Sequence, residues 1–283
     1  MSVTLRPGAR YDMPVAYGAS AAIPVSQGFQ TYTATLTFRT EAGALTRLMP
    51  RWFAPAGDPL VSVGYTRMAG MEWMGGRDYN IVSVGTPAVS VGGPDEVRGR
   101  YTLAIWESDC APILAGRELM GSPKLFGQIP DVDVTAPEFS FSCAEYDALL
   151  VEGTLHDMSE LTSEQLAPLT AAGRESVGLN WKYLPGLDGE PDADYPTALY
   201  MSTPYDWARR GSGSVRFGTP SDAEAPYSGK IARALAKLPL LELRDAVALH
   251  ASGCVLYRNK TRRLDRPSPR TRSNRWHDSS GSS

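Results

Sequence analysis

The sequence is poor in cysteine and histidine, the side chains that most often form cross-links or hold metals. Its 283 residues include three cysteines, Cys110, Cys143 and Cys254, which are widely spaced and form no Cys-x-x-Cys pair. An odd number without that spacing argues against a disulfide framework and against a zinc site, and it predicts reduced thiols. The three histidines are also far apart and have no ligand spacing. We therefore expect no bound metal.

Long apolar runs and an excess of basic charge are also missing. No stretch approaches the roughly 18 apolar residues of a membrane span, and no apolar core of a secretory signal follows the first methionine. The net charge of −3 provides no basic field that would hold nucleic acid. We expect a cytoplasmic protein without a membrane or nucleic-acid partner.

Alternating and β-branched runs predict many strands and few helices. Strands are expected at 30–40, 59–73, 77–91, 98–107, 138–142, 148–156, 197–203, 214–217 and 240–257. Helices are expected at 41–49, 111–120, 159–172 and 227–238, with Asp109 capping the second. Residues 185–195 are rich in Pro, Gly and Asp and predict a loop. The fold class is α+β, mainly β.

The chain divides by composition into three parts. Residues 1–28 are rich in Pro, Gly, Ala and Ser and predict an irregular N-terminal arm. Residues 29–261 carry the strands and helices and predict a single domain. At 262–283 the composition changes to Arg, Pro, Ser and Asn, which predicts a disordered basic tail.

Lysine is scarce, and one lysine lies in an apolar segment. Of 28 basic residues five are lysine, and Lys124 has Leu119, Met120, Leu125 and Phe126 as near neighbours. An ammonium held away from water loses hydration, so its pKa falls and a nucleophilic amine becomes available. Schiff-base lysines use this chemistry. The alternative is that Lys124 follows a Ser-Pro turn and points into solvent.

The order of residues around Lys124 resembles the signature of the acetoacetate decarboxylase family. Gly116–Leu119 (Gly-Arg-Glu-Leu) and then Ser122–Lys124 (Ser-Pro-Lys) are similar to the family's Gly-Arg-Glu-Leu and Pro-Lys segments, whose lysine forms the substrate imine. Weaker matches occur in order over residues 28–260. The resemblance implies a cone-shaped, largely antiparallel β-barrel with an interior active site. It also implies chemistry without a cofactor, and a homo-oligomer.

Four positions depart from the family pattern. The second lysine of the classical decarboxylases is replaced by Leu125, which leaves desolvation as the cause expected to lower the pKa of Lys124. Two pocket glutamates of the family fall at Gly64 and Ile81, and an arginine that binds the substrate carboxylate falls near Thr31. The nucleophile is retained while its usual partners have changed.

Other residues are also expected to belong to the site. The predicted substrate-binding residues are Arg77, Tyr79, Trp106, Arg117, Glu118 and Phe126. Arg117 and Glu118 have an alternative role, as a structural ion pair that holds the segment of Lys124. Asp78 or Glu72 could replace the missing glutamates.

Three functions remain open from the sequence. The first is a lyase of secondary metabolism that decarboxylates a β-keto acid, or a related polyketide-like carbonyl compound, through an imine on Lys124. The second is an aldolase, dehydratase or cyclase that uses the same lysine. The third is a ligand-binding protein without catalysis. The product distinguishes the first two, because only a decarboxylase releases CO2.

Overall fold

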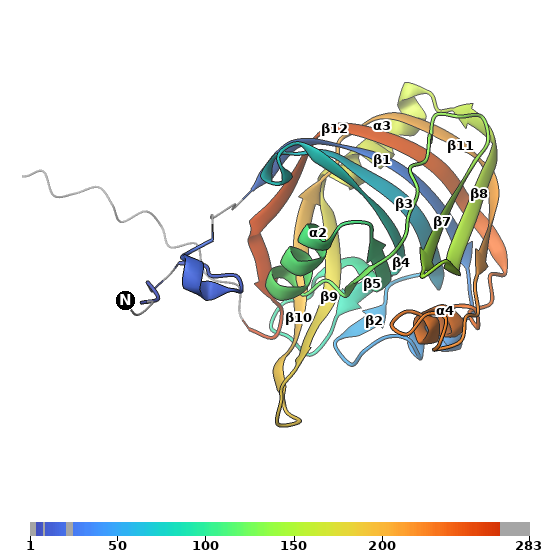
Figure 1. The fold of residues 1–283 in the computed structure, drawn as a ribbon. Helices are drawn as coiled ribbons and strands as arrows, with labels where there is room; N and C mark the ends of the chain where they lie inside the picture. The colour runs from blue at the N-terminus through green and yellow to red at the C-terminus, as the bar shows by residue number, and fades with distance from the viewer. Residues whose placement is uncertain (1–3, 8, 21–24, 267–283) are drawn as a thin grey trace, which may run out of the picture.

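A twelve-stranded sheet that closes on itself dominates the computed structural model, which describes residues 4–7, 9–20 and 25–266 (Figure 1). Closure occurs because strand β1 (Ser26–Arg39) pairs with β3 on one edge and with the long strand β12 (Glu242–Arg263) on the other. Threonines alternate with aromatic and aliphatic residues along β1, so one face of the strand is polar and the other largely apolar. The closed arrangement therefore has an apolar outside and a polar inside along β1.

The strand order is β1-β3-β4-β5-β9-β10-β12-β11-β8-β7. All pairings are antiparallel except those of β5 with β6 and with β9. The remaining strands are β2 (Phe53–Pro55), β3 (Leu60–Met71), β4 (Arg77–Ser90), β5 (Arg98–Glu107), β6 (Lys124–Phe126), β7 (Phe139–Glu145), β8 (Ala148–Glu160), β9 (Ser176–Pro185), β10 (Pro191–Ser202) and β11 (Tyr205–Phe217). The predicted fold class, mainly β with a largely antiparallel closed sheet, is confirmed.

The helices are few and short. They are α1 (Ala42–Thr46), α2 (Cys110–Ala115), α3 (Ser163–Arg174), α4 (Gly229–Leu235), the 3-10 turns η1 (Val15–Tyr17) and η2 (Glu72–Met74), and the π-helical turn η3 (Gly116–Met120). The predicted cap of α2 is confirmed, because the Asp109 carboxylate accepts a hydrogen bond from the Ala111 backbone N–H at 2.8 Å. No helix in the described ranges has the length and apolarity needed to cross a membrane.

The two faces of the closed strands have different neighbours. Apolar residues on the outer face of β1, β3, β4 and β5 pack with β7, β8 and α4 into the largest core cluster. Figure 1 shows these covering elements gathered on one side of the molecule, away from β9 and β10. The other face of the same strands points inward and lines a cavity. Strand alternation thus separates packing residues from cavity residues.

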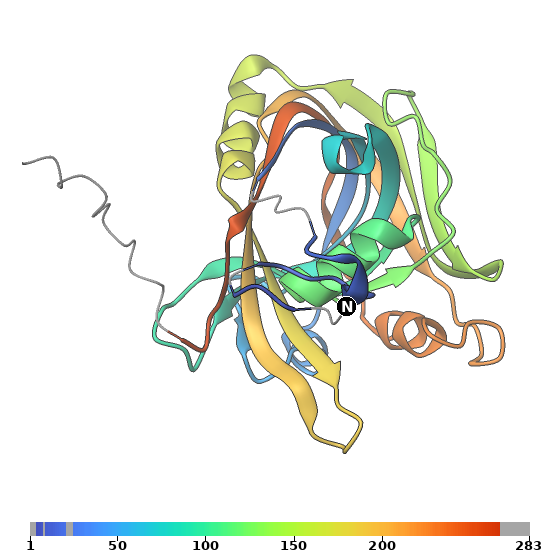
Figure 2. The same cartoon turned by 60° about the vertical axis from the view of Figure 1, so that its left-hand side comes forward.

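The expectation of a loop at 185–195 is wrong for most of its length. Strands β9 and β10 continue into this segment and form a hairpin that projects from the body (Figure 2). The turn itself is confined to a few residues around Gly189, which has φ of +93°. Cross-strand pairs such as Tyr195 with Lys182 hold β9 and β10 together. The strand propensity of these polar residues alone did not predict strands here.

The ordered domain extends beyond the predicted boundary at residue 261. Strand β12 runs to Arg263, and Leu264 is fully buried in a cluster with Phe53 and Tyr101. The rest of the predicted tail, residues 267–283, lies outside the described residues. Residues 1–3, 8 and 21–24 of the predicted N-terminal arm also lie outside them.

Candidate active site

The closed part of the sheet encloses a cavity of about 300 Å3. Strands β1, β3, β4, β5, β6, β9, β10 and β12 all contribute to its wall. Three charged side chains line it, namely Lys124, Glu107 and Arg100, and most of the remaining polar lining consists of threonine and serine. A cavity with a few charged groups among neutral walls is typical of small-molecule sites.

An irregularity in β5 brings two of these charged residues onto the same wall. The register between β4 and β5 shifts by one residue, so that Leu103 is an extra residue on β5. Strict alternation would place Arg100 and Thr102 on the opposite face from Ile105 and Glu107. Because of the bulge, all four line the cavity.

Lys124 reaches the cavity from β6, which pairs in parallel with β5 so that Lys124 lies opposite Ile105. Its side chain therefore extends beside that of Glu107, and Nζ lies 2.7 Å from Glu107 Oε1. Nζ also donates a hydrogen bond to the Pro112 carbonyl oxygen at 3.1 Å. Lys124 is 7% exposed and Glu107 is 0% exposed. The pair is a buried ion pair at the cavity wall.

The segment before Lys124 is built to let its side chain pass. A Cβ on Gly116 would lie 2.5 Å from Lys124 Cε, so only glycine leaves room for the lysine stem at this position. Helix α2 continues into the π-helical turn η3, a local geometry that frequently occurs at functional sites. The turn ends at Gly121, which has φ of +76°, where glycine avoids strain. The chain can then reverse into β6.

The Glu107 carboxyl is held in an unusual electrostatic environment. Burial raises its pKa above the ordinary value, and the neighbouring Lys124 charge lowers it only in part, while Asp109 adds to the rise. No hydrogen-bond donor among the described residues satisfies Oε2. A carboxylate with poor solvation and one cation beside it readily accepts a proton from that cation.

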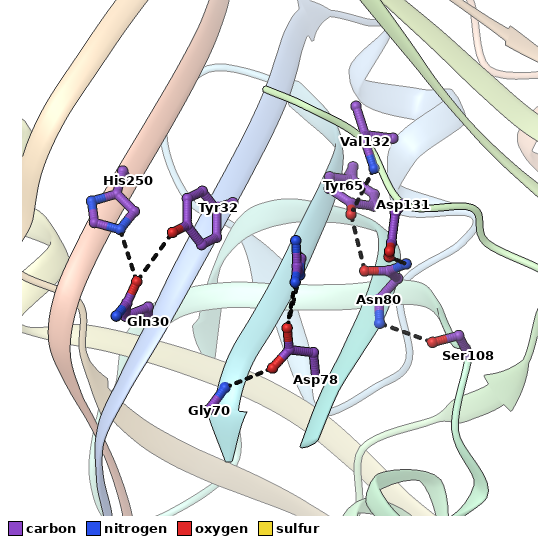
Figure 3. A network of polar contacts seen from close by, with 11 residues as sticks. Gln30, Tyr32, Tyr65, Gly70, Asp78, Asn80, Ser108, Asp131, Val132 and His250 are labelled. Carbon is purple, nitrogen blue, oxygen red and sulfur yellow. Dashed lines mark hydrogen bonds and ion pairs between the residues drawn. The ribbon is translucent and has the colours of Figure 1, made fainter. Parts of the chain in front are cut away.

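A partly buried polar network fixes the ends of the strands that carry this pair (Figure 3). On β4 the Asn80 backbone N–H donates to the Ser108 hydroxyl at 2.9 Å, directly after Glu107. The Asn80 side chain donates to Asp131 Oδ1 at 2.8 Å and accepts from the Tyr65 hydroxyl at 2.9 Å. The network therefore ties the end of β5 and the segment after β6 to β3 and β4.

The positions that correspond to the family's pocket residues do face the cavity. Thr31, Gly64 and Ile81 all line it together with Lys124. At Gly64 a Cβ would lie 2.8 Å from the Ala34 carbonyl oxygen, so a glutamate there requires the backbone to move. Glu107 supplies a carboxylate from another strand.

The proposed replacements Asp78 and Glu72 lie elsewhere. Asp78 accepts from Arg67 and from the Gly70 backbone N–H outside the cavity. Glu72 is exposed in the turn η2. Glu72 lies past the end of β3 at Met71, and Asp78 precedes the inward-facing Tyr79 on β4, so strand alternation directs its side chain to the opposite face.

Two of the predicted aromatic pocket residues do not reach the cavity. Trp106 lies between Ile105 and Glu107 and so points to the opposite face, where its Nε1 donates to the Ser228 hydroxyl at 2.9 Å. Phe126 is 55% exposed on the outside of the molecule. Tyr79 does line the cavity, and burial raises the pKa of its hydroxyl well above the usual range, so it remains a proton donor.

The predicted charged partners have other contacts. Arg77 is exposed and donates to the Met74 carbonyl at 2.7 Å outside the cavity. Arg117 donates to the Lys124 backbone carbonyl at 2.9 Å, so it holds the lysine segment as expected, but through the backbone and without an ion pair to Glu118. Glu118 is exposed.

The apolar cover expected for Lys124 is also different. Of the four predicted neighbours only Met120 lines the cavity. Leu125 packs against the core on the other side of β6, and Leu119 is largely exposed, as is Phe126. Within the described ranges, no cluster of three His, Cys, Asp or Glu side chains is arranged to hold a metal ion.

Comparison with known proteins identifies the relatives of this chain. A family model described as acetoacetate decarboxylase matches residues 12–251. An acetoacetate decarboxylase from Chromobacterium violaceum is 29% identical over 156 residues, which cover 55% of this chain and 59% of that relative. The match thus spans less than two thirds of the relative's length.

Solved structures show the same fold at low identity. A structure of acetoacetate decarboxylase superposes with a TM-score of 0.70 at 17% identity, covering 90% of this chain and 95% of the other. The enduracididine biosynthesis enzyme MppR, solved with the condensation product of pyruvate and imidazole 4-carboxaldehyde, has a TM-score of 0.66 at 18% identity, covering 91% of this chain and 98% of the other.

Proposed function

This chain belongs to the acetoacetate decarboxylase family, and from that premise we propose that it is a cofactor-independent Schiff-base lyase with Lys124 as its nucleophile. The observation that carries the proposal is the buried pair of Lys124 and Glu107 at the wall of the cavity. The substrate is a small keto acid or a related carbonyl compound.

The pair can carry both the nucleophile and its proton. In the first step a proton passes from the Lys124 ammonium to the Glu107 carboxylate, a transfer that the raised pKa of Glu107 favours. The neutral amine then attacks the substrate carbonyl. Glu107 returns its proton to the carbinolamine hydroxyl, which leaves as water. The result is an iminium on Lys124 and an ionised Glu107.

The iminium then accepts the electron pair of a bond at the β position. If that bond joins a carboxylate, CO2 leaves and an enamine remains, which takes a proton on carbon. Water addition to the new iminium releases the ketone and restores the amine. Glu107, 2.7 Å from Nζ in the resting protein, and the hydroxyls of Tyr79 and Tyr205 are acid and base groups at the cavity wall.

An aldolase, dehydratase or cyclase activity is the second candidate. The same iminium supports carbon–carbon bond formation when the carbon beside the imine carbon loses a proton to a base and the resulting enamine adds through that carbon to an aldehyde, whose oxygen takes up a proton. Two observations favour this candidate: the family's glutamate positions hold Gly64 and Ile81, and MppR, of the same fold, was solved with a condensation product. A ligand-binding protein without turnover is the third candidate.

Product analysis separates these functions. We expect the intact protein to convert keto acids with release of CO2, and Lys124→Arg to lose turnover, since a guanidinium stays protonated and cannot attack a carbonyl. Lys182→Arg, outside the cavity, is the matched control and should keep full activity. A product that keeps its carboxylate favours the second candidate. Undiminished turnover in Lys124→Arg rejects the proposal.

The cytoplasmic location and the homo-oligomeric state remain predictions. The exposed aromatic residues Trp181 and Tyr183 on the projecting hairpin provide apolar surface for contact between copies. Light scattering of the purified protein measures the number of copies directly.

A further inference from the structure

The cavity contains a cation for which no described side chain supplies a counter-charge. Arg100 lines the cavity from β5, and no carboxylate within the described ranges lies within ion-pairing distance of it. Burial lowers the pKa of Arg100 to about 10. Arg100 is half-buried, and a charge that is partly removed from water without a counter-charge is unfavourable in a folded protein. Such a residue at a cavity wall is best explained by an anionic ligand.

The guanidinium of Arg100 has only weak neutral contacts. Its Nη2 lies 3.3 Å from the Ser62 carbonyl oxygen and 3.4 Å from the Ser83 hydroxyl, both long for hydrogen bonds. The group rests on Gly85, where an added Cβ would lie 2.6 Å from Nε. Glycine at this position therefore lets the guanidinium lie flat against β4, with its remaining N–H groups available to a ligand.

A second polar group, which has no hydrogen-bond partner among the described residues, lies on the other side of β5 from the Arg100 guanidinium. Asn180 on β9 also lines the cavity, is 2% exposed, and its Oδ1 has no hydrogen-bond partner in the described structure. The parallel register of Arg100 with Gly178 places Asn180 level with Thr102. Thr102 in turn pairs with Gly85 beneath the guanidinium. Arg100, Thr102 and Asn180 thus present polar groups at one level of the cavity.

This level lies well away from the reactive amine. Ser83 on β4 and Lys124 on β6 both pair with Ile105 on β5. Strand β5 therefore lies between β4, on which the Arg100 guanidinium rests, and β6, which carries the lysine. Neighbouring strands lie about 4.8 Å apart, which separates the two outer strands by roughly 10 Å. Nζ turns toward Glu107, at the end of β5 farther from Arg100.

We propose that Arg100, with Asn180 and Thr102, binds a carboxylate that is distant from the reacting carbonyl of the substrate. The inference rests on the proposed function, because it places the carbonyl carbon at Lys124. With carbon–carbon bonds of about 1.5 Å, a chain of about four bonds between carbonyl carbon and carboxylate carbon is needed to reach both groups. The substrate class is therefore an extended keto acid.

The bound carboxylate is the one that the reaction keeps. A carboxylate leaving as neutral CO2 would lose its contact with Arg100, so an ion pair there would stabilise the ground state more than the transition state. A distal carboxylate keeps its contact throughout and anchors the substrate while bonds change near Lys124. If the reaction is a decarboxylation, the substrate therefore has two carboxylates. One binds Arg100, and the other, on the carbon next to the carbonyl carbon, leaves as CO2.

Reductive trapping with borohydride tests this inference without requiring turnover. The probes are pyruvate, acetoacetate, 5-oxohexanoate and methyl 5-oxohexanoate, and the readout is the probe concentration that half-saturates labelling of Lys124. We expect 5-oxohexanoate to saturate at the lowest concentration. Its methyl ester should need about tenfold to a hundredfold more, the loss expected for one charge-assisted hydrogen bond.

Three variants at two positions of β5 complete the test. Arg100→Met should label equally well with the acid and the ester. Its unfolding temperature should be unchanged or higher, because a half-buried charge without a counter-charge is removed. Arg98→Met, exposed and paired with Glu96, is the control and should keep the preference for the acid. Arg100→Lys should recover part of that preference.

The outcomes separate the two proposals. Equal labelling by acid and ester in the natural protein, or an acid preference that survives in Arg100→Met, overturns the role of Arg100 while leaving the imine on Lys124 intact. If pyruvate or acetoacetate half-saturates the labelling at a lower concentration than 5-oxohexanoate, the distal position of the carboxylate is overturned. A failure of every probe, including the neutral ester, to label Lys124 overturns the proposed function and this inference with it.

Discussion

A Cβ on Gly116 would lie 2.5 Å from Cε of Lys124 and 2.9 Å from its Nζ. The lysine stem thus occupies the volume where any other residue at position 116 would place its side chain. The glycine and the lysine, eight positions apart in the sequence signature, are parts of one packing unit. The π-helical turn brings Gly116 back over the lysine stem. The glycine of the signature is explained by this contact.

Gly116→Ala should therefore displace the amine from Glu107. We expect a loss of stability of about 1–3 kcal/mol, typical of overpacking, together with a fall in imine formation. Gly178→Ala is the matched control, because its Cβ would meet nothing closer than 3.8 Å in the same cavity wall. Chemical denaturation and borohydride labelling measure the two effects. A Gly116→Ala protein that labels normally would contradict this packing argument.

Removal of the ammonium should make stability depend on pH. In Lys124→Met the Glu107 carboxyl stays buried without its cation, so burial alone keeps its folded-state pKa above the ordinary value of 4.5. The folded form then binds more protons than the unfolded form between these two values. Stability is fully present below the unfolded pKa and is lost as the pH rises through the raised folded pKa.

The expected size of this loss is about 3–5 kcal/mol at pH 8, as for a broken buried ion pair, and less at pH 5. Urea unfolding of Lys124→Met at the two pH values provides the measurement. Adding Glu107→Gln should recover most of the stability at pH 8, because it removes the unpaired charge. Equal losses at pH 5 and pH 8 would show that Glu107 does not carry the effect.

The buried Leu264 should be needed for folding, unlike the chain after residue 266. Leu264 packs with Phe53 and Leu179 beyond the end of β12. Leu264→Ala should cost about 2–5 kcal/mol. A chain ending at 266 should unfold at the same temperature as the full chain, whereas one ending at 261 should unfold earlier. Matching unfolding temperatures for all three chain lengths would refute this boundary.

The sequence predicted the elements that depend on local pattern. The alternation along β1 and the cap at Asp109 are both properties of neighbouring residues, and both are present. The hairpin of β9 and β10 escaped prediction because its polar residues are held by cross-strand pairs. The long strand β12 also depends on partners far away in sequence, since three different strands pair with it.

The site was predictable where it depends on the signature and not where it depends on register. Lys124 could be recognised from the residues around it, but Glu107 joins it through parallel pairing of β5 with β6. Trp106 and Glu107 are adjacent, and the sequence alone does not say which one faces inward. The bulge at Leu103 further reverses the alternation, which brings Arg100 to the cavity. An acidic residue at the end of an apolar strand was the available signal.

The most direct test of the central claim is a peptide map of the protein after borohydride reduction with a keto acid. We predict one modified peptide, carrying the mass of the reduced substrate on Lys124, and no modification in Lys124→Arg. Glu107→Gln should form the same adduct more slowly, because the proton acceptor is lost while the amine remains. Modification of Lys182 or Lys230 with Lys124 unlabelled would contradict the account.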